Sequence, residues 1–215
     1  MTALAIPGLS RLLVLGAHCD DIEIGCGATV MHLVNRHPGL SVQWATFSGD
    51  RERRDETQRA AEAFLDGAGT RQVDVFDFRD GYFPWVGDAI KDRFEEIART
   101  FVPDLVLTHH RHDRHQDHRV ISDLTWNTFR RQLVLEYEVP KWDGDLGRPN
   151  VYVPLSDADV QRKIAHLMTF YASQRSRDWF TEDLFAGMMR LRGVECRAAS
   201  GFAEAFYGYK LTLAG

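Results

Sequence analysis

Residues 11–16 read RLLVLG, a continuous apolar run that ends in glycine. Such a run is typical of a strand that is buried on both faces of a sheet. Predicted helices and strands then alternate as far as residue 108. The helices are expected over residues 27–36, 53–65 and 88–101, and the further strands over residues 42–47, 73–78 and 105–108. This order with short connections predicts an α/β fold: a Rossmann-like, doubly wound, mostly parallel sheet with helices on both faces, in three α/β/α layers.

The second half of the chain is less regular. We predict helices over residues 118–133 and 157–173, a strand over 150–155 and a final strand over 207–213. Residues 134–156 include the polar turn WDGDLGRPN and are expected to be an irregular, substrate-specific segment. By default its acidic residues form a solvated face; they are Glu136, Glu138, Asp143 and Asp145. Because no repeat or linker is evident, residues 1–215 are expected to form one domain.

The composition excludes several classes of protein. The 215 residues carry a net charge of -5, which argues against a nucleic-acid partner, because domains that bind the phosphate backbone are usually basic. Three cysteines, an odd number, exclude a purely internal disulfide framework and suit a reducing cytosol. No apolar run approaches the roughly 18 residues of a membrane helix, and none resembles a signal peptide. We therefore expect a cytoplasmic protein without a membrane span, and the sequence is compatible with a homo-oligomer.

Histidine is concentrated in one place. Five of the nine histidines fall within residues 109–118, directly after the predicted strand 105–108. A second polar segment, Ala-His-Cys-Asp-Asp at residues 17–21, directly follows the predicted strand 11–16. Ligands of doubly wound sheets bind beyond the carboxyl ends of the strands, at the point where the strand order reverses. We therefore expect these two strands to be neighbours and the two polar segments to meet in one crevice.

The spacing within the two segments suits a metal site. His18 and Asp21 are three residues apart, as are His115 and His118, and this spacing lets both members of a pair face the same way. Two imidazoles and one carboxylate with an open position form a catalytic zinc arrangement, and one imidazole is left over. Asp20 would then be a free carboxylate beside a metal-bound water, as a general base must be. The alternative is that Asp20 or Asp21 only caps the next helix.

These segments resemble a known family. AHCDDIEIGCGAT at residues 17–29 is similar to the AHPDDxxxGxGGT signature of the LmbE/PIG-L-like zinc-dependent N-acetylglucosaminyl deacetylases, and RHQDH at residues 114–118 is similar to its HxDH motif. Cys19 replaces the usual proline and Ala28 the second glycine of GGT; neither position supplies a ligand. Weaker matches follow in the family's order: Arg53-x-x-Glu56, Arg79-Asp80-Gly81, Tyr171-Ala-Ser-Gln174 and Ala203-Glu204-Ala-Phe206.

The resemblance implies a reaction and a role for each residue. The reaction is removal of the N-acetyl group from an acetylated amino sugar or sugar conjugate, a small molecule, with release of acetate and a free amine. The metal is Zn²⁺, and Fe²⁺ or Co²⁺ would suit the same nitrogen and oxygen ligands. The implied roles are zinc ligand for His18, Asp21 and His118, general base for Asp20, oxyanion stabiliser for His115, orientation of His115 for Asp117, and contact with sugar hydroxyls for Arg53 and Asp80.

Other interpretations explain less of the sequence. Dinucleotide binding needs G-x-G-x-x-G, but Val30 stands where the third glycine would be. An iron(II)-dependent oxygenase could use His115, Asp117 and His166 as its three ligands, which leaves His18 and Asp21 without a role. A non-catalytic metal-binding module would have no need for the free carboxylate of Asp20 and the remaining histidine, His115.

Two neighbouring features have both a functional and a structural interpretation. Cys19 lies beside the predicted metal and could be a nucleophile, but it lacks a partner base of its own, so we expect it to be packed in the core. Tyr82, Phe83 and Trp85 follow Asp80 and could stack on a sugar face. Aromatic packing beneath a loop is the alternative for these three residues.

Overall fold

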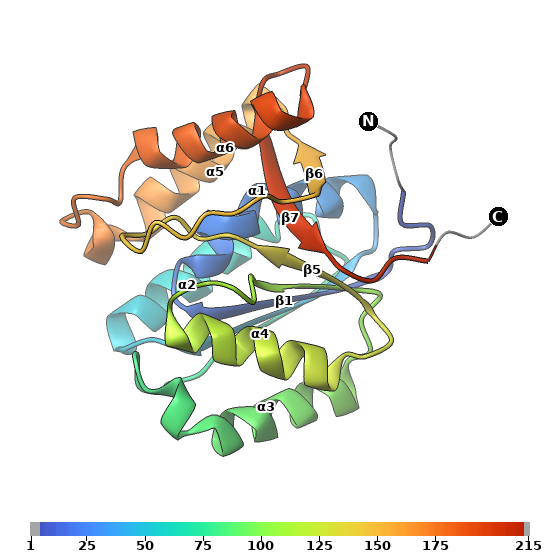
Figure 1. The fold of residues 1–215 in the computed structure, drawn as a ribbon, viewed down its shortest axis with the longest axis vertical. Helices are drawn as coiled ribbons and strands as arrows, with labels where there is room; N and C mark the ends of the chain where they lie inside the picture. Colours follow the sequence, from blue (N-terminus) through green and yellow to red (C-terminus); the bar gives the residue numbers. More distant parts are fainter. Residues whose placement is uncertain (1–4, 213–215) are drawn as a thin grey trace.

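The computed structural model describes residues 5–212, and in that part of the chain seven strands form one sheet (Figure 1). Their order is β3-β2-β1-β4-β5-β7-β6. The first five strands in this order are parallel to one another, and β7 runs antiparallel to both β5 and β6. The strands are β1 (Arg11–His18), β2 (Ser41–Ser48), β3 (Thr70–Val75), β4 (Leu105–His109), β5 (Leu133–Tyr137), β6 (Val151–Pro154) and β7 (Ala203–Gly208).

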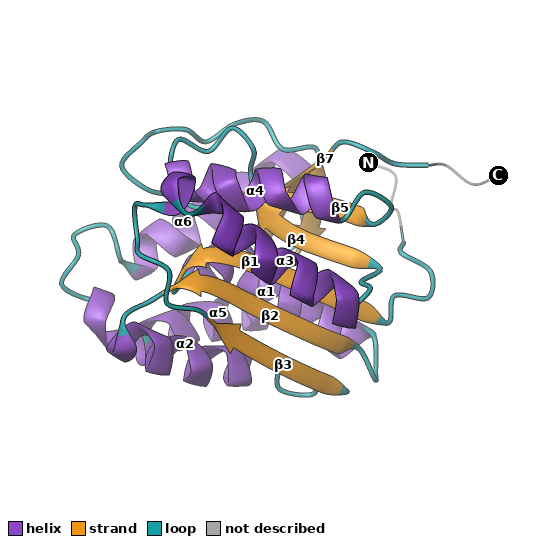
Figure 2. Ribbon diagram, turned by 90° about the horizontal axis from the view of Figure 1, so that it is seen from below, coloured by secondary structure: helices purple, strands orange, loops and turns teal. Residues whose placement is uncertain are grey.

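Helices cover both faces of this sheet. α3 and α4 lie on one face, in front of the strands in Figure 2, and α1, α2, α5 and α6 pack together on the other. The predicted doubly wound, three-layer fold is therefore confirmed. The helices are α1 (Asp21–Arg36), α2 (Arg51–Phe64), α3 (Gly87–Thr100), α4 (Gln116–Thr128), α5 (Asp157–Phe170) and α6 (Glu182–Cys196), with short 3-10 turns η1 (Phe83–Trp85) and η2 (Ala172–Gln174).

The apolar run at the start of the chain forms the central strand β1. Leu12 and Val14 point into the core beneath α1, whereas Leu13 and Leu15 point into the core beneath α3 and α4. Successive side chains of a strand alternate between its faces, so a strand covered by helices on both sides must be apolar at every position.

The two polar segments meet because β1 and β4 are adjacent and parallel. Leu12 pairs with Leu105 and Val14 with Leu107. From this pair the chain winds outwards in both directions, to β2 and β3 on one side and to β5 on the other. The carboxyl ends of β1 and β4 therefore open a crevice at the reversal of strand order, and the prediction that these strands are neighbours is confirmed.

α1 begins six residues before its predicted start at residue 27. The prediction left Gly25 outside the helix and began the helix at Gly27, yet both glycines lie well inside it. A β-carbon would come within 2.2 Å of the Tyr137 ring at Gly25 and within 2.6 Å of the Phe64 ring at Gly27. These glycines allow close packing of a buried helix rather than a turn.

Several element boundaries differ from the predicted ones. β3 ends at Val75 instead of residue 78, although Phe76 and Phe78 still donate backbone hydrogen bonds to carbonyls of β2. The predicted helix 118–133 ends at Thr128, and the one at 157–173 ends at Phe170.

Three further differences concern whole elements. β5 is a central strand that sequence analysis left inside an irregular segment, and α6 was not predicted. The last strand ends at Gly208, before most of the predicted 207–213, and Leu213 lies outside the described residues. No helix in the described part of the chain is long and apolar enough to cross a membrane.

Candidate metal centre

Three buried donor atoms converge where β1 and β4 end. His18 Nδ1 lies 3.3 Å from Asp21 Oδ2 and 3.2 Å from His118 Nε2, and the last two atoms are 3.4 Å apart. A tetrahedral metal with bonds of about 2.0–2.1 Å separates its ligands by roughly 3.3–3.4 Å. The three donor atoms therefore already have the spacing of three corners of such a tetrahedron, and their residues fit a divalent metal.

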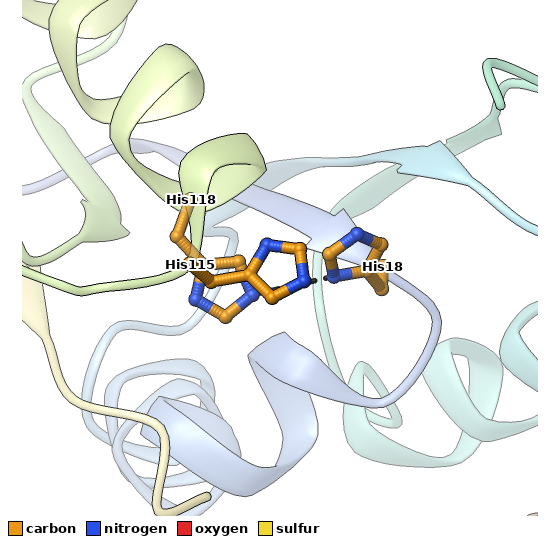
Figure 3. Close-up of side chains that lie close together, drawn as sticks. All are labelled: His18, His115 and His118. Carbon is orange, nitrogen blue, oxygen red and sulfur yellow. Dashed lines mark hydrogen bonds between the residues drawn. The ribbon is translucent and has the colours of Figure 1, made fainter. Parts of the chain in front are cut away.

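The fold supplies these side chains from two segments of the chain. His18 is the last residue of β1 and Asp21 the first of α1, whereas His115 precedes α4 and His118 lies in its first turn. Figure 3 shows the His18 ring facing the two rings from α4. His115 is the remaining imidazole, close enough to His18 and His118 for one nitrogen of each to lie within 4.8 Å of the others.

A carboxylate behind His118 fixes its ring. His118 Nδ1 donates to Asp113 Oδ2 over 2.9 Å, which leaves Nε2 free to face the other two donors. Burial alone would raise the pKa of Asp113, but the hydrogen bond from His118 holds it below its ordinary value. A carboxylate that orients a ligating imidazole is typical of metal sites. Sequence analysis missed Asp113, although it stands only five residues before His118.

The other face of His18 contacts two more carboxylates. Its Nε2 lies 3.1 Å from Asp117 Oδ2 and 3.0 Å from Asp80 Oδ1. Asp117 also accepts the backbone N–H groups of Gly81 and Phe83, so its carboxylate is held in place. The resemblance assigns Asp117 to the orientation of His115; in the structure its carboxylate contacts His18, and its backbone N–H contacts His115.

His115 is held by the backbone instead. Its Nδ1 accepts the N–H of Asp117 over 3.3 Å, which makes His115 the cap of α4. In the neutral ring this leaves the proton on Nε2. Burial, together with the nearby rings of His118 and His18, lowers the pKa of His115 below its ordinary value. With Nδ1 occupied in this way, a neutral His115 ring offers its Nε2–H as a donor.

Asp20 has the properties of a general base. Its backbone is in the left-handed region (φ 92°) and its side chain does not cap α1. Oδ2 is buried without a hydrogen bond, and lies 3.1 Å from Arg53 Nη2 in an ion pair. Burial raises the pKa of Asp20 to about 7, although Arg53 acts in the opposite direction. A carboxyl that titrates near neutral pH can both take and return a proton.

His109 is a second residue that sequence analysis did not place in the site. Its ring stacks on His118 with centroids 3.9 Å apart, and its Nε2 lies 3.3 Å from Asp21 Oδ2. That nitrogen already accepts the N–H of Ala17 over 2.8 Å, so it has no lone pair left for a metal. Burial lowers the pKa of His109 to about 4. His109 is thus a neutral ring that supports His118 and Asp21.

Residues of the weaker motifs contact the first motif or one another. Arg53, besides its ion pair with Asp20, donates to the Cys19 carbonyl. Glu56 accepts the backbone N–H of Ser173 over 2.9 Å and its hydroxyl over 2.6 Å, so two distant motifs meet. Glu204 accepts the N–H groups of Ala28 and Thr29 inside α1.

The structure bears on two alternatives, the oxygenase triad and a nucleophilic Cys19. His166 lies in α5 against Phe64, on the opposite face of the sheet from α4, so the oxygenase triad with His115 and Asp117 is not assembled. Cys19 is packed as expected: its Sγ donates to the Ser48 carbonyl, and burial raises its pKa to about 12.

The structure also bears on the aromatic residues after Asp80 and on the acidic residues of segment 134–156. Among the three aromatic residues after Asp80, Phe83 is buried, whereas Tyr82 and Trp85 are exposed. The expected solvated acidic face is wrong for Glu136 and Glu138, which are both buried. Glu136 accepts hydrogen bonds from Arg111 and Trp126, and Glu138 from Arg192 and Tyr207, which compensates their burial.

Comparison with known proteins identifies the family of this chain. Residues 13–129 match the PIG-L family, described as GlcNAc-PI de-N-acetylase, and the chain belongs to this family. The uncharacterized deacetylase YaiS of Escherichia coli is 28% identical over 140 residues, which cover 60% of this chain and 74% of YaiS.

Solved structures share the fold with less sequence identity. The N,N'-diacetylchitobiose deacetylase of Pyrococcus horikoshii is 18% identical with a TM-score of 0.68, and the match covers 94% of this chain and 84% of that one. GalB, the 4-carboxy-2-hydroxymuconate hydratase of Pseudomonas putida, is 17% identical with a TM-score of 0.78, over 96% and 99% of the two chains. A hydratase and a deacetylase share this fold, so the reaction must be argued from the site.

Proposed function

We propose that this protein is a metal-dependent N-deacetylase. It hydrolyses the acetamido group of an N-acetylated amino sugar or sugar conjugate to acetate and a free amine. The observation that carries the proposal is the triangle of donor atoms from His18, Asp21 and His118, with the buried carboxylate of Asp20 beside it, whose Oδ2 makes no hydrogen bond. Membership of a de-N-acetylase family and the similarity to a deacetylase support the same reaction.

His18, Asp21 and His118 would hold the metal, with Zn²⁺ as our first choice and Fe²⁺ or Co²⁺ as alternatives. A divalent metal in such a site lowers the pKa of a bound water and polarises an amide carbonyl. The carboxylates on the outer nitrogens of His18 and His118 keep both rings in the orientation and tautomer that binding requires.

Two side chains of the protein carry the proton and the charge of the reaction. Asp20 takes the proton of the attacking water and returns it to the leaving amine nitrogen, and its pKa of about 7 suits both steps. Arg53 holds Asp20 in position through their ion pair. His115 donates its Nε2–H to the oxygen of the tetrahedral intermediate, because its Nδ1 is occupied by the backbone of Asp117.

We also propose two side chains that contact the substrate, and a cellular compartment for the protein. Asp80 is well exposed at the mouth of the site, with a side chain that is 62% accessible, and Arg53 is 20% accessible; we propose that both contact sugar hydroxyls. The three cysteines are buried and unpaired, which suits a reducing compartment such as the cytoplasm.

One experiment tests the function directly. Purified protein is analysed for metal and incubated with a panel of acetylated amino sugars and glycosides, and mass spectrometry detects the loss of one acetyl group. We expect about one divalent metal per chain, and activity that a chelator abolishes and added Zn²⁺ restores. A metal-free preparation with full activity, or a metal-loaded protein that removes no acetyl group from the whole panel, would contradict the proposal.

The role of His115 can be separated from that of the ligands. His115→Ala is expected to keep the metal while turnover falls by about 10²–10³, the loss typical of one oxyanion donor. Metal content and initial rates are measured together. The matched control is His112→Ala, because His112 is an exposed histidine of the same cluster and faces His110 rather than the donor triangle. If His115→Ala loses its metal and His118→Ala keeps it, the two roles are reversed.

A further inference from the structure

A buried ion pair contacts the middle of α1 from two neighbouring elements. Lys163 of α5 and Glu204 of β7 lie 2.6 Å apart between Nζ and Oε1, and their side chains are only 2% and 3% accessible. Removal of two charges from water is costly, and replacement of such a pair by apolar side chains is often neutral or stabilising. Stability alone therefore does not account for these two charged residues, and the reaction proposed above uses neither of them.

Both charged groups bond to the backbone of α1. Glu204 Oε1 accepts the N–H of Ala28 over 3.1 Å, and its Oε2 accepts that of Thr29 over 2.6 Å. Lys163 Nζ donates to the carbonyl of Ile24 over 2.5 Å. In a regular α-helix the N–H of residue 28 pairs with the carbonyl of residue 24, so the ion pair is bonded to both members of one helical pair. Side chains that insert into the hydrogen bonds of a helix alter its local path.

Ile24 belongs to the first turn of α1, the turn that carries the two aspartates of the site. Its N–H donates to the carbonyl of Asp20 over 2.9 Å, while its own carbonyl accepts from Lys163. Asp20 has a left-handed backbone with φ 92°, and Asp21 follows it directly. A strained backbone of this kind persists only where the surrounding structure determines it. The ion pair supplies such a constraint on the helical side of the strained residue.

We propose that Lys163 and Glu204 are positioning residues that fix the first turn of α1. This turn keeps Asp21 in the donor triangle and Asp20 beside it, so the ion pair sets the geometry of the site from the far side of the helix. Both residues act through the backbone of the helix rather than by touching the substrate. The effect on metal binding rests on the proposed function, whereas the effect on the backbone of this turn does not.

Hydrogen exchange of the full-length, metal-free protein tests whether the ion pair fixes this turn. The main variant is Lys163→Met/Glu204→Met, which removes both charges together and leaves neither unpaired in the core. We expect the amides of residues 18–27 to exchange at least about tenfold faster than in the wild type, because the turn opens more easily. The amides of residues 90–100 in α3 are the internal control and should keep their exchange rates. Unchanged exchange over residues 18–27 would overturn the inference.

Calorimetric titration of the metal-free protein with Zn²⁺ tests the consequence for the site. The paired variant is expected to bind Zn²⁺ at least about tenfold more weakly, the lower end of the loss for a partner outside the ligands. The matched control is Ile97→Ala, which removes buried apolar atoms of α3 in the core on the opposite face of the sheet and so lowers stability alone. This control should bind Zn²⁺ as tightly as the wild type. Equal affinities in all three proteins, or an equal loss in both variants, would overturn the inference.

If the paired variant does not fold, Glu204→Gln carries the same two expectations, because it keeps the size of the side chain but removes its charge and one acceptor. The two proposals fail separately. A wild-type protein that binds no Zn²⁺ would overturn the metal-dependent deacetylase, and the exchange rates would still decide the inference. Zn²⁺ binding and acetate release by the wild type, together with unchanged exchange in the variant, would overturn the inference alone.

Discussion

Asp20→Asn is expected to lower turnover by about 10²–10⁴ while the metal content stays near one per chain. The range is that of general acid–base catalysis, and asparagine removes the base while it keeps the shape of the side chain. Asparagine also tolerates the left-handed backbone of this position, where alanine would be strained. Metal analysis and initial rates on the same preparation distinguish a lost base from a lost ligand.

A buried carboxyl three residues further along the chain provides the control. Glu23 is inaccessible to solvent, and its Oε1 accepts a hydrogen bond from the Tyr171 hydroxyl. Burial raises the pKa of Glu23 to about 8, so the group is protonated at neutral pH and glutamine is a close substitute. Glu23→Gln should therefore keep activity within roughly threefold of the wild type, within the small range of a mutation that creates no cavity and no unpaired charge. Full activity in Asp20→Asn would remove Asp20 from the reaction.

The sequence was sufficient to predict the centre of the fold and the meeting of the two motifs. An apolar run buried on both faces requires helices on both sides, and the alternation of elements requires parallel strands. Once β1 and β4 are neighbours, the residues that follow them must share one edge of the sheet, which brings His18 close to His118. These inferences depend on local patterns and on a general rule of topology, and they need no knowledge of distant contacts.

The elements that sequence analysis missed lack local signals. β5 follows α4 without a proline or glycine between Phe129 and Leu133, so an apolar helix pattern continues into the strand. α6 contains Gly187 and Gly193, which discourage a helix assignment. Gly193 is there because a β-carbon would come within 2.1 Å of the Gly201 carbonyl oxygen. That reason is a tertiary contact and is not visible in the local pattern.

The difference between local patterns and tertiary contacts also decides which parts of the site could be predicted. Ligand spacing of three residues is a local property and could be read directly, but the partners of each ring come from elsewhere in the chain. Asp113 and Lys141 are 28 residues apart and become neighbours only because β5 lies beside β4. Likewise, Glu204 contributes through the backbone of α1 and the ammonium group of Lys163. Their roles follow from strand order, which the spacing of residues does not reveal.

Asp21→Ala should remove the metal as well as the activity. Asp21 is the only carboxylate in the donor triangle, so its loss removes both a ligand and the negative charge that balances the metal. Loss of an outer-shell partner typically costs 10–100-fold in metal affinity, and we expect loss of this ligand to cost at least about a hundredfold. The Asp21 carboxylate also accepts the His18 N–H over 2.7 Å, so Asp21→Asn is the companion variant that keeps an acceptor there.

Thermal unfolding in the presence of Zn²⁺ measures this loss without a substrate. At a free zinc concentration of about 100 times the dissociation constant, binding stabilises the wild-type protein by about 2.7 kcal/mol. For a chain of this length that corresponds to a rise in Tm of roughly 5–10 °C. Asp20→Asn should show the same rise, because it leaves the three donors intact, whereas Asp21→Ala and Asp21→Asn should show almost none. An equal rise in all four proteins would mean that the metal is held elsewhere, and an equal loss in the three variants would mean that Asp20 is itself a ligand.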